Sequence, residues 1–283
     1  MQDISDTARW AAVFRARETE RKDALFRDPF AEVLAGARGE QITDTLEHAG
    51  EHSWAWVMRT YLFDRIITAQ VKDGVDLVLN LAAGLDARPY RMALPAGLRW
   101  VEVDLPHLNA YKQEILANKK PVCALERISL DLNNVAARRG LFTRLGNQAK
   151  RALVLTEGLL IYLTAEENAA LAEDLFEQPK FADWLLDLAS PSLFAFLQQT
   201  TGQHTAGAGA PFQFAPPEGP EFFEPYGWTP VEIRSILQTA VETGRAPEEL
   251  RGFTASYAEP PQPWRLPIMW SGVCLMERKE PSH

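Results

Sequence analysis

Short apolar runs that alternate with helical stretches constrain this chain more than any other feature of its sequence. Apolar strands connected by helices are typical of βαβ units, in which a mostly parallel sheet is covered on both faces. The sequence therefore predicts an α/β fold with such a sheet at its centre. The five runs are Asp76–Ala82, Leu98–Asp104, Cys123–Leu130, Arg151–Thr156 and Phe181–Leu188.

The residues before position 76 carry helical patterns. Apolar residues with helical spacing predict one helix within Ser5–Arg21 and a second, largely buried helix over Glu51–Lys72. Between them, Asp28 is a typical N-cap and Gly36 a typical helix end, which predicts a short additional helix. We therefore expect residues 1–75 to form a helical part that precedes the sheet.

The residues after the fifth run predict one more helix and one more strand. A capping-box pattern from Thr229 to Glu232 predicts a helix that ends at Gly244. The apolar run Met269–Glu277 predicts a last strand, which could close the sheet as an antiparallel edge. Residues 202–220 have Gly or Pro at eight of nineteen positions and predict either a lid over an active site or a plain connection.

The net charge and the cysteine content exclude several classes of protein. The 283 residues include 29 Lys and Arg against 38 Asp and Glu, and the net charge of −9 disfavours binding to nucleic acid or to an anionic membrane. Cys123 and Cys274 form no CxxC pair, so we expect neither a disulfide framework nor a cysteine zinc site, and we assign no metal ligands. The polar N-terminus and the absence of an apolar run of about 18 residues predict a soluble, cytoplasmic protein without a membrane span.

Polar residues at the ends of the strands are the candidate binding groups, because open parallel sheets bind ligands beyond the carboxyl ends of their strands. Gly84 follows the first run, and Asp104 ends the second, twenty residues later. That spacing is typical of a carboxylate that binds the ribose of a nucleotide, although Asp104 could instead cap the helix after Pro106. Asp131 follows the third run and could bind an adenine amine, with Leu132 against the ring, or form an Asx turn.

Three further charged residues are candidates. Glu157 follows the fourth run among apolar residues, where an unpaired carboxylate is costly, so we expect a cationic partner or a ligand. Arg59 lies on an apolar helical stripe, and Arg15 lies in the first helix. Both could clamp a carboxylate, for which the guanidinium is the best-shaped donor, or they could form salt bridges to Asp64, Glu18 or Asp28.

Taken together, these stretches resemble the leucine carboxyl methyltransferase family, whose bacterial members are S-adenosylmethionine-dependent O-methyltransferases. The resemblance covers most of the chain in the family's order. It is carried by Arg15–Ala31 (RARETERKDALFRDPFA), Arg59–Asp64 (RTYLFD), Asn80–Arg91 (NLAAGLDARPYR), Val101–Pro106 (VEVDLP), Ser129–Leu132 (SLDL), Thr156–Leu163 (TEGLLIYL) and Phe223–Trp228 (FEPYGW).

The resemblance implies a class I methyltransferase fold, with a mostly parallel, Rossmann-like sheet of seven strands flanked by helices. It implies one domain over residues 1–283, in which the N-terminal helices are followed by a cofactor-binding core at 76–190. Residues 191–260 would then form a helical and loop cap over the acceptor, and residues 261–283 the closing strand.

Carried over by position, the resemblance implies that seven residues bind S-adenosylmethionine. They are Arg15 and Arg59 for the methionine carboxylate, Gly84 for the cofactor loop, Asp104 for the ribose, Asp131 with Leu132 for the adenine, and Glu157 for the methionine side. The sequence departs from the family at Ala82, where Gly is common, and at Ala87, where Thr is common. We expect an ordinary negative φ at Ala82 and a lost hydroxyl at Ala87.

The implied reaction is methyl transfer to a carboxylate or hydroxyl oxygen of a small organic acceptor in an apolar, aromatic pocket. A carboxylate acceptor needs no general base and a hydroxyl does, and none of the five histidines stands in a base motif. The catalytic residue and the oligomeric state are therefore left unassigned, with Tyr162 and Tyr226 as possible acceptor-pocket groups.

Three alternatives remain at this point. The first is methylation of a protein C-terminal carboxylate, and the second is a protein that binds the cofactor without transferring the methyl group. The third is a nicotinamide-dependent oxidoreductase on a similar fold, which the single glycine of Asn80–Asp86 disfavours because a pyrophosphate needs a glycine-rich loop. Of the aromatic residues after position 190, Phe194 and Phe196 are expected to be ordinary core. The others flank residues 202–220 and are expected to line the acceptor pocket: Phe212, Phe214, Phe222, Phe223, Tyr226 and Trp228.

Overall fold

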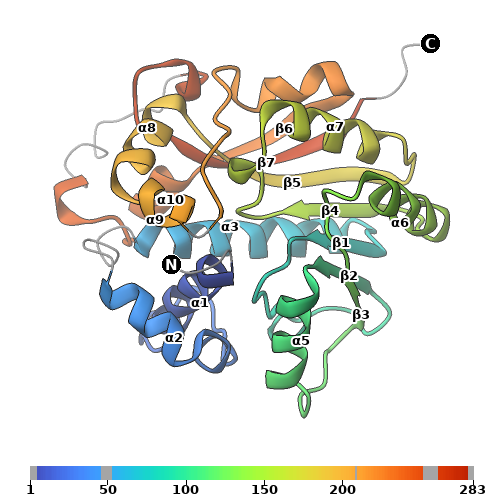
Figure 1. Ribbon diagram of the computed structural model, residues 1–283, viewed down its shortest axis with the longest axis horizontal. Coiled ribbons are helices and arrows are strands. Elements are labelled where there is room, and N and C mark those ends of the chain that lie inside the picture. Colours follow the sequence, from blue (N-terminus) through green and yellow to red (C-terminus); the bar gives the residue numbers. More distant parts are fainter. Residues whose placement is uncertain (1–4, 46–52, 208, 251–260, 280–283) are drawn as a thin grey trace.

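A sheet of seven strands runs through the middle of the computed structural model, which describes residues 5–45, 53–207, 209–250 and 261–279 (Figure 1). The strand order is β3-β2-β1-β4-β5-β7-β6, with β1 to β5 parallel and β7 antiparallel to both of its neighbours. All five predicted strands are present, each within one residue of its predicted ends. The strands are β1 (Leu77–Leu81), β2 (Arg99–Asp104), β3 (Ala124–Ser129), β4 (Ala152–Thr156), β5 (Phe181–Ala189), β6 (Trp228–Ser235) and β7 (Ser271–Arg278).

Helices cover both faces of the sheet. In the part of the chain that the structure describes, no helix is both long and apolar enough to cross a membrane. The α-helices are α1 (Ser5–Thr19), α2 (Ala31–Thr45), α3 (Ser53–Lys72), α4 (Arg88–Arg91), α5 (Pro106–Ile115), α6 (Val135–Gln148), α7 (Ala165–Phe176), α8 (Pro191–Thr200), α9 (Gly202–Gly207) and α10 (Ile236–Glu242). The 3-10 helices are η1 (Leu160–Tyr162), η2 (Gly219–Tyr226) and η3 (Pro263–Arg265).

The central strands are buried on both faces. Leu79 of β1 packs in one core with Phe142 of α6, whereas its neighbour Val78 packs in a second core with Phe63 of α3. Because both sides of these strands are apolar, their sequences are continuous apolar runs rather than alternating patterns. Helix α3 is buried as predicted, with seven buried residues.

The predicted end of the second helix at Gly36 is a kink. Gly36 has φ 59° and ψ −179° inside α2, and helical structure then continues to Thr45. A left-handed glycine is typical of a helix end, but here a second helical segment begins immediately after it.

The region from Trp228 to Ser235 is a strand, so the predicted start of the helix at Thr229 is wrong, although a helix, α10, does precede Gly244. Trp228 is fully buried, with its ring centre 5.5 Å from that of Trp184 of β5. Pro230 is tolerated because β6 is the edge of the sheet and is bulged after this residue. The helix begins only at α10, where the Ser235 side chain accepts a hydrogen bond from the Gln238 N–H. Because β6 pairs with the outer side of β7, the last strand of the chain, β7, is an inner strand of the sheet and not the edge strand that was predicted.

The Gly- and Pro-rich segment 202–220 divides into two parts. Its beginning forms the short helix α9, directly after α8. In the second part, Ala210 and Phe214 are buried whereas Pro211, Gln213 and Glu218 are exposed. Phe214, Phe223 and Trp228, which were expected to line the acceptor pocket, pack in the main core instead. The Gln213 N–H also donates to the carbonyl oxygen of Ile161, at 2.7 Å.

Helix α8 is less buried than its apolar sequence predicted. Phe194 and Phe196, expected in the core, are only half-buried, and no side chain of α8 is fully buried. Figure 1 shows α1, α2, α8 and α9 on the side of the molecule toward which β4 points. These helices therefore lie beyond the carboxyl ends of the strands, where a ligand would bind.

Candidate functional site

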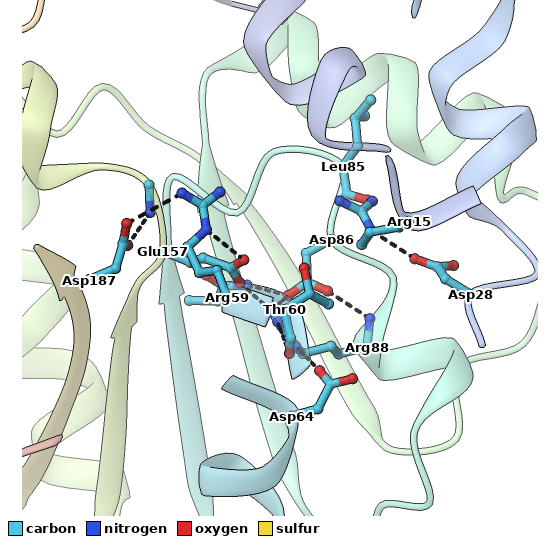
Figure 2. A network of polar contacts seen from close by, with 12 residues as sticks. Arg15, Asp28, Arg59, Thr60, Asp64, Leu85, Asp86, Arg88, Glu157 and Asp187 are labelled. Atoms are coloured by element: carbon cyan, nitrogen blue, oxygen red, sulfur yellow. Dashed lines mark hydrogen bonds and ion pairs between the residues drawn. The ribbon is translucent and has the colours of Figure 1, made fainter. Parts of the chain in front are cut away.

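The carboxyl ends of β1, β2, β4 and β5 lie at one edge of the sheet, where charged side chains gather. The strand order reverses between β1 and β4, so this edge contains the topological switch point at which open α/β sheets bind their ligands. Figure 2 shows the charged residues there, which come from α3, from the loop and short helix after β1, and from the ends of β4 and β5.

Asp104 at the end of β2 is fixed by two backbone donors. Its Oδ2 accepts a hydrogen bond from the Gly84 N–H at 2.6 Å, and its Oδ1 accepts one from the Leu105 N–H at 2.7 Å. Burial raises the pKa of Asp104, against the effect of these two donors. The N-cap of α5 is Leu105, which has no side-chain cap, so the alternative in which Asp104 caps that helix is wrong.

The turn after β1 differs from the expectation for Ala82. Ala82 has φ 51°, in the left-handed region that favours glycine, and the ordinary negative φ predicted for it is wrong. Gly84, two residues later, has φ 49°. The chain must turn sharply here so that the Gly84 N–H reaches Asp104, and tertiary contacts hold Ala82 in a strained conformation.

Arg59 of α3 lies between two carboxylates (Figure 2). Its Nε donates to Oε1 of Glu157 at 3.2 Å, and its Nη1 donates to Oδ2 of Asp187 at 3.3 Å. Its guanidinium lies 4.6 Å from the centre of the Trp56 ring. Glu157 thus has the cationic partner that its apolar surroundings predicted, whereas the salt bridge from Arg59 to Asp64 does not form.

Arg88 of α4 is the centre of the charged cluster. Its side chain is 3% exposed, and it donates to Oδ1 of Asp64 at 2.6 Å, to Oδ2 of Asp86 at 3.0 Å and to Oε2 of Glu157 at 2.7 Å. Burial opposes the ionisation of Asp86, but the charges of Arg88 and its neighbours lower the pKa of Asp86 to about 2. Arg88 therefore connects α3, the β1 loop and the end of β4.

The sequence analysis missed Arg88, Asp86 and Asp187. Arg88 and Asp86 lie within the stretch that follows the first strand, and Asp187 lies inside the apolar fifth strand. A charge within an apolar strand is costly unless it is paired. That signal could have identified Asp187, but it could not have identified its partner, which is 128 residues away in sequence.

These side chains form one connected cluster, which we call the ion network. In it, four arginines meet five carboxylates, so the network has an excess of one negative charge. Its members are Arg15, Arg59, Arg88, Arg91, Asp28, Asp64, Asp86, Glu157 and Asp187.

Arg15 joins this network at its outer side. Its Nε donates to Asp28 at 2.9 Å, which is the salt bridge that the sequence analysis gave as the alternative to a clamp. Its Nη2 also donates to the carbonyl oxygen of Leu85 at 2.7 Å. Helix α1 therefore lies over the β1 loop, and a Cβ at Gly84 would come within 3.3 Å of Ala8.

Asp131 and Leu132 follow β3, away from the ion network. Asp131 is exposed, and its Oδ1 accepts a hydrogen bond from the Asn133 N–H at 2.9 Å, as in the Asx turn given as the alternative. Leu132 is half-buried and packs against the main core. The structure brings Arg59, Glu157 and Arg15 into one network and Asp104 onto Gly84, but it leaves Asp131 at a separate position along the edge.

Tyr162 of η1 lies close to Arg59. Burial raises the pKa of Tyr162 to about 12, although the charge of Arg59 and a hydrogen bond with Thr7 act in the opposite direction. The Tyr162 ring centre is 5.5 Å from that of Phe212. An aromatic pair thus lies beside the charged groups at the ends of β4 and β5.

Comparison with known proteins agrees with this architecture. A relative from Frankia alni, described as a candidate S-adenosyl-L-methionine-dependent methyltransferase, is 32% identical over 264 residues, which cover 84% of this chain and 88% of the relative. A DUF574 family protein from Streptomyces avermitilis has a TM-score of 0.58 at 16% identity and covers 95% of this chain and 97% of its own. A candidate methyltransferase from Thermobifida fusca has a TM-score of 0.56 at 16% identity, with coverage of 95% and 94%.

The strand order and the structural neighbours define a class I methyltransferase fold. Residues 8–176 match the leucine carboxyl methyltransferase family. The chain belongs to this family, and by that membership it is an S-adenosylmethionine-dependent methyltransferase.

Proposed function

We propose that this protein transfers the methyl group of S-adenosylmethionine to an oxygen of a small organic acceptor. The observation that carries the proposal is the carboxyl edge of the sheet, where two backbone donors fix Asp104 and the ion network has a formal excess of one negative charge. At neutral pH the cofactor has a sulfonium, an ammonium and one carboxylate, so its net charge of about +1 is complementary to that of the network.

The cofactor residues follow from the order of the strand ends. Asp104 would accept hydrogen bonds from the ribose hydroxyls, with Gly84 in the adjacent loop, while Asp131 and Leu132 would hold the adenine. Glu157 and Arg59 would hold the methionine part, because a guanidinium and a carboxylate match its carboxylate and ammonium groups. For Arg15, the bonds to Asp28 and Leu85 favour a second role, in which it holds α1 over the cofactor loop.

When bound, the cofactor supplies an activated methyl group for displacement by a nucleophilic oxygen. The protein's contribution is then mainly to orient the acceptor and to exclude water. The pair of Tyr162 and Phe212 supports an acceptor position beside Arg59, and the half-buried apolar side chains of α8 support a cap above it. Residues 210–226 are unsuited to open as a lid, because Phe214 and Phe223 are buried.

Cofactor binding is tested by calorimetry. Wild-type protein should bind S-adenosylmethionine, and Asp104→Ala should bind it about 10- to 100-fold more weakly, because the ribose loses an ionised acceptor. Asp76→Ala, at the opposite end of β1, is the matched control and should keep the affinity. Equal affinity of wild type and Asp104→Ala would remove Asp104 from the site.

The acceptor class is tested with cofactor that carries a labelled methyl group and a panel of aromatic acids, phenols and peptides with free C-termini. Mild alkali releases methanol from a methyl ester but leaves a methyl ether intact, so it distinguishes carboxylate from hydroxyl acceptors. The proposal expects the label on a small molecule. Label found only on the peptides would instead support a protein carboxylate as the acceptor.

A further inference from the structure

Asp187 has no task in the proposed function, although it lies in the middle of the site. It belongs to β5, and its Oδ1 accepts a hydrogen bond from the Gly158 N–H at 2.6 Å. Its Oδ2 accepts the bond from Arg59 at 3.3 Å, and its side chain is only 18% exposed. An ionised carboxylate this close to an apolar core needs a reason, because burial disfavours the charged form.

Without Asp187, the positive and negative charges of the ion network would be equal in number. Arg59 already has a carboxylate partner in Glu157, which is itself bound by Arg88. Among the described residues, Asp187 makes a single ion pair, and this pair is longer than the three that Arg88 makes, which range from 2.6 to 3.0 Å. With Asp187 removed, four arginines would meet four carboxylates. Of the five carboxylates, Asp187 has the longest distance to its nearest arginine, so its charge is the least compensated.

Asp187 also lies beside Glu157, one of the residues proposed to hold the methionine part of the cofactor. Glu157 and Asp187 follow paired residues of neighbouring strands, since Thr156 of β4 is opposite Leu186 of β5. Both carboxylates therefore stand at the same level of the sheet edge and share Arg59. Burial raises the pKa of Asp187 even though Arg59 and the Gly158 N–H favour the ionised form. Asp187 is therefore a largely buried carboxylate with one described ion-pair partner, Arg59, which it shares with Glu157.

We propose that Asp187 makes the site select the charged sulfonium cofactor over its uncharged, demethylated product. This inference rests on the proposed function, because it requires S-adenosylmethionine at this edge. Cofactor and product differ by one methyl group and one positive charge. A residue that recognises the charge attracts the cofactor before the reaction and no longer attracts the product after it, which favours exchange of product for new cofactor.

The test is calorimetric and needs no acceptor. Wild type and Asp187→Asn are each titrated with S-adenosylmethionine, with S-adenosylhomocysteine, and with an analogue that carries an amine in place of the sulfonium. Asn keeps an oxygen for the Gly158 N–H but has no charge. We expect both charged ligands to bind Asp187→Asn about tenfold more weakly and S-adenosylhomocysteine less than about threefold more weakly. Equal loss for all three ligands, or no loss for the charged ones, would overturn the inference.

Two further variants separate charge from structure. Asp187→Glu keeps the charge and should keep the wild-type ratio of the two affinities. Asp183→Asn removes a buried carboxylate of the same strand, which is paired with Arg151 away from the site, and should leave the ratio unchanged. If Asp187→Asn does not fold, Asp187→Ser gives the same comparison. If wild type does not bind S-adenosylmethionine, the proposed function itself is wrong. If wild type binds it but Asp187→Asn keeps the wild-type ratio of the affinities for S-adenosylmethionine and S-adenosylhomocysteine, only this inference is wrong.

Discussion

Individual carboxylates at the sheet edge are held by backbone groups of other elements. Asp104 accepts from Gly84 and Asp187 accepts from Gly158, at 2.6 Å in both cases. A backbone N–H in a turn has little freedom to move, so each carboxylate has one orientation before any ligand binds. Such preorganisation lowers the cost of binding, because little order has to be created in the complex.

Ala82 is a residue whose replacement should stabilise the protein. It has φ 51°, which costs a residue with a Cβ about 1–2 kcal/mol. Ala82→Gly should raise the free energy of unfolding by about 0.5–1 kcal/mol, after the greater freedom of glycine in the unfolded chain is subtracted. Urea denaturation gives the value. Ala83→Gly, at the next residue, should lower it by about 0.5–1 kcal/mol, and the same sign for both variants would contradict strain at Ala82.

Asp86 should make stability depend on pH in the acid range. Its pKa is about 2 in the folded protein against an ordinary 3.8, so its ionised form stabilises the fold above the unfolded value. This contribution is lost as the pH falls from about 4 through about 2. At neutral pH, Asp86→Asn should reduce the free energy of unfolding by about 2 kcal/mol. Denaturation at several pH values should show this deficit shrinking below about pH 4, and a constant deficit would mean that packing rather than charge is lost.

Among the secondary-structure elements, η2 shows how a segment with a loop-like composition becomes core. Glu221 of η2 accepts hydrogen bonds from Gln262 at 2.6 Å and from Arg265 of η3 at 2.9 Å. Phe223 packs against Trp184 of β5, with ring centres 4.8 Å apart. Contacts from β5 and from η3 thus fix η2 from two sides, which local sequence composition does not reveal.

The contact between η2 and η3 can be tested at Gly219. A Cβ there would lie 2.3 Å from the Trp264 ring, and the residue has φ 60°. Gly219→Ala should destabilise the protein by about 3 kcal/mol or more, because the clash adds to the backbone strain. Gly244 has φ 69°, but a Cβ there would meet no described atom within 4 Å, so Gly244→Ala should cost only about 1 kcal/mol. Equal losses of stability for Gly219→Ala and Gly244→Ala in thermal or urea unfolding would show that η2 can shift away from Trp264 at little cost.

Across the whole molecule, the ion network joins the N-terminal helices to the sheet. It connects α1 and α3 with α4 and with the ends of β4 and β5. Its members come from positions 15 to 187 of the chain, so it can form only when all of these elements are in place. We therefore expect that breaking the network lowers the stability of the folded protein.

Arg88→Met tests this coupling. It would leave Asp64, Asp86 and Glu157 without their shared partner, and breaking a buried ion pair in this way typically costs about 3–5 kcal/mol. Arg144→Met is the matched control, because it removes an exposed pair with Glu126 that should be worth at most about 1 kcal/mol. Similar losses for the two variants in urea denaturation would mean that the network contributes little to stability.

The sequence by itself determined the parallel sheet and the strand ends that carry the candidate cofactor residues. A strand that is buried on both faces is apolar almost throughout, and this local pattern predicted β1 and β4 closely. Strand β3 has no buried residue, and its run, which includes Glu126 and Arg127, predicted its position without such burial. Asp104 and Glu157 could be placed at the edge of the sheet for the same reason, since a residue that follows a parallel strand lies at its carboxyl end. The family resemblance rested on these same stretches.

Tertiary structure alone decided the strand at Trp228–Ser235, the left-handed turn at Ala82 and the partners of the charged residues. A capping-box pattern indicates how a helix can begin, but pairing with β7 and burial of Trp228 outweigh it. Arg59 meets Glu157 98 residues away and Asp187 128 residues away. No local pattern encodes which charges will meet at such separations, because the topology of the sheet brings them together and burial then selects the pairs that can remain ionised.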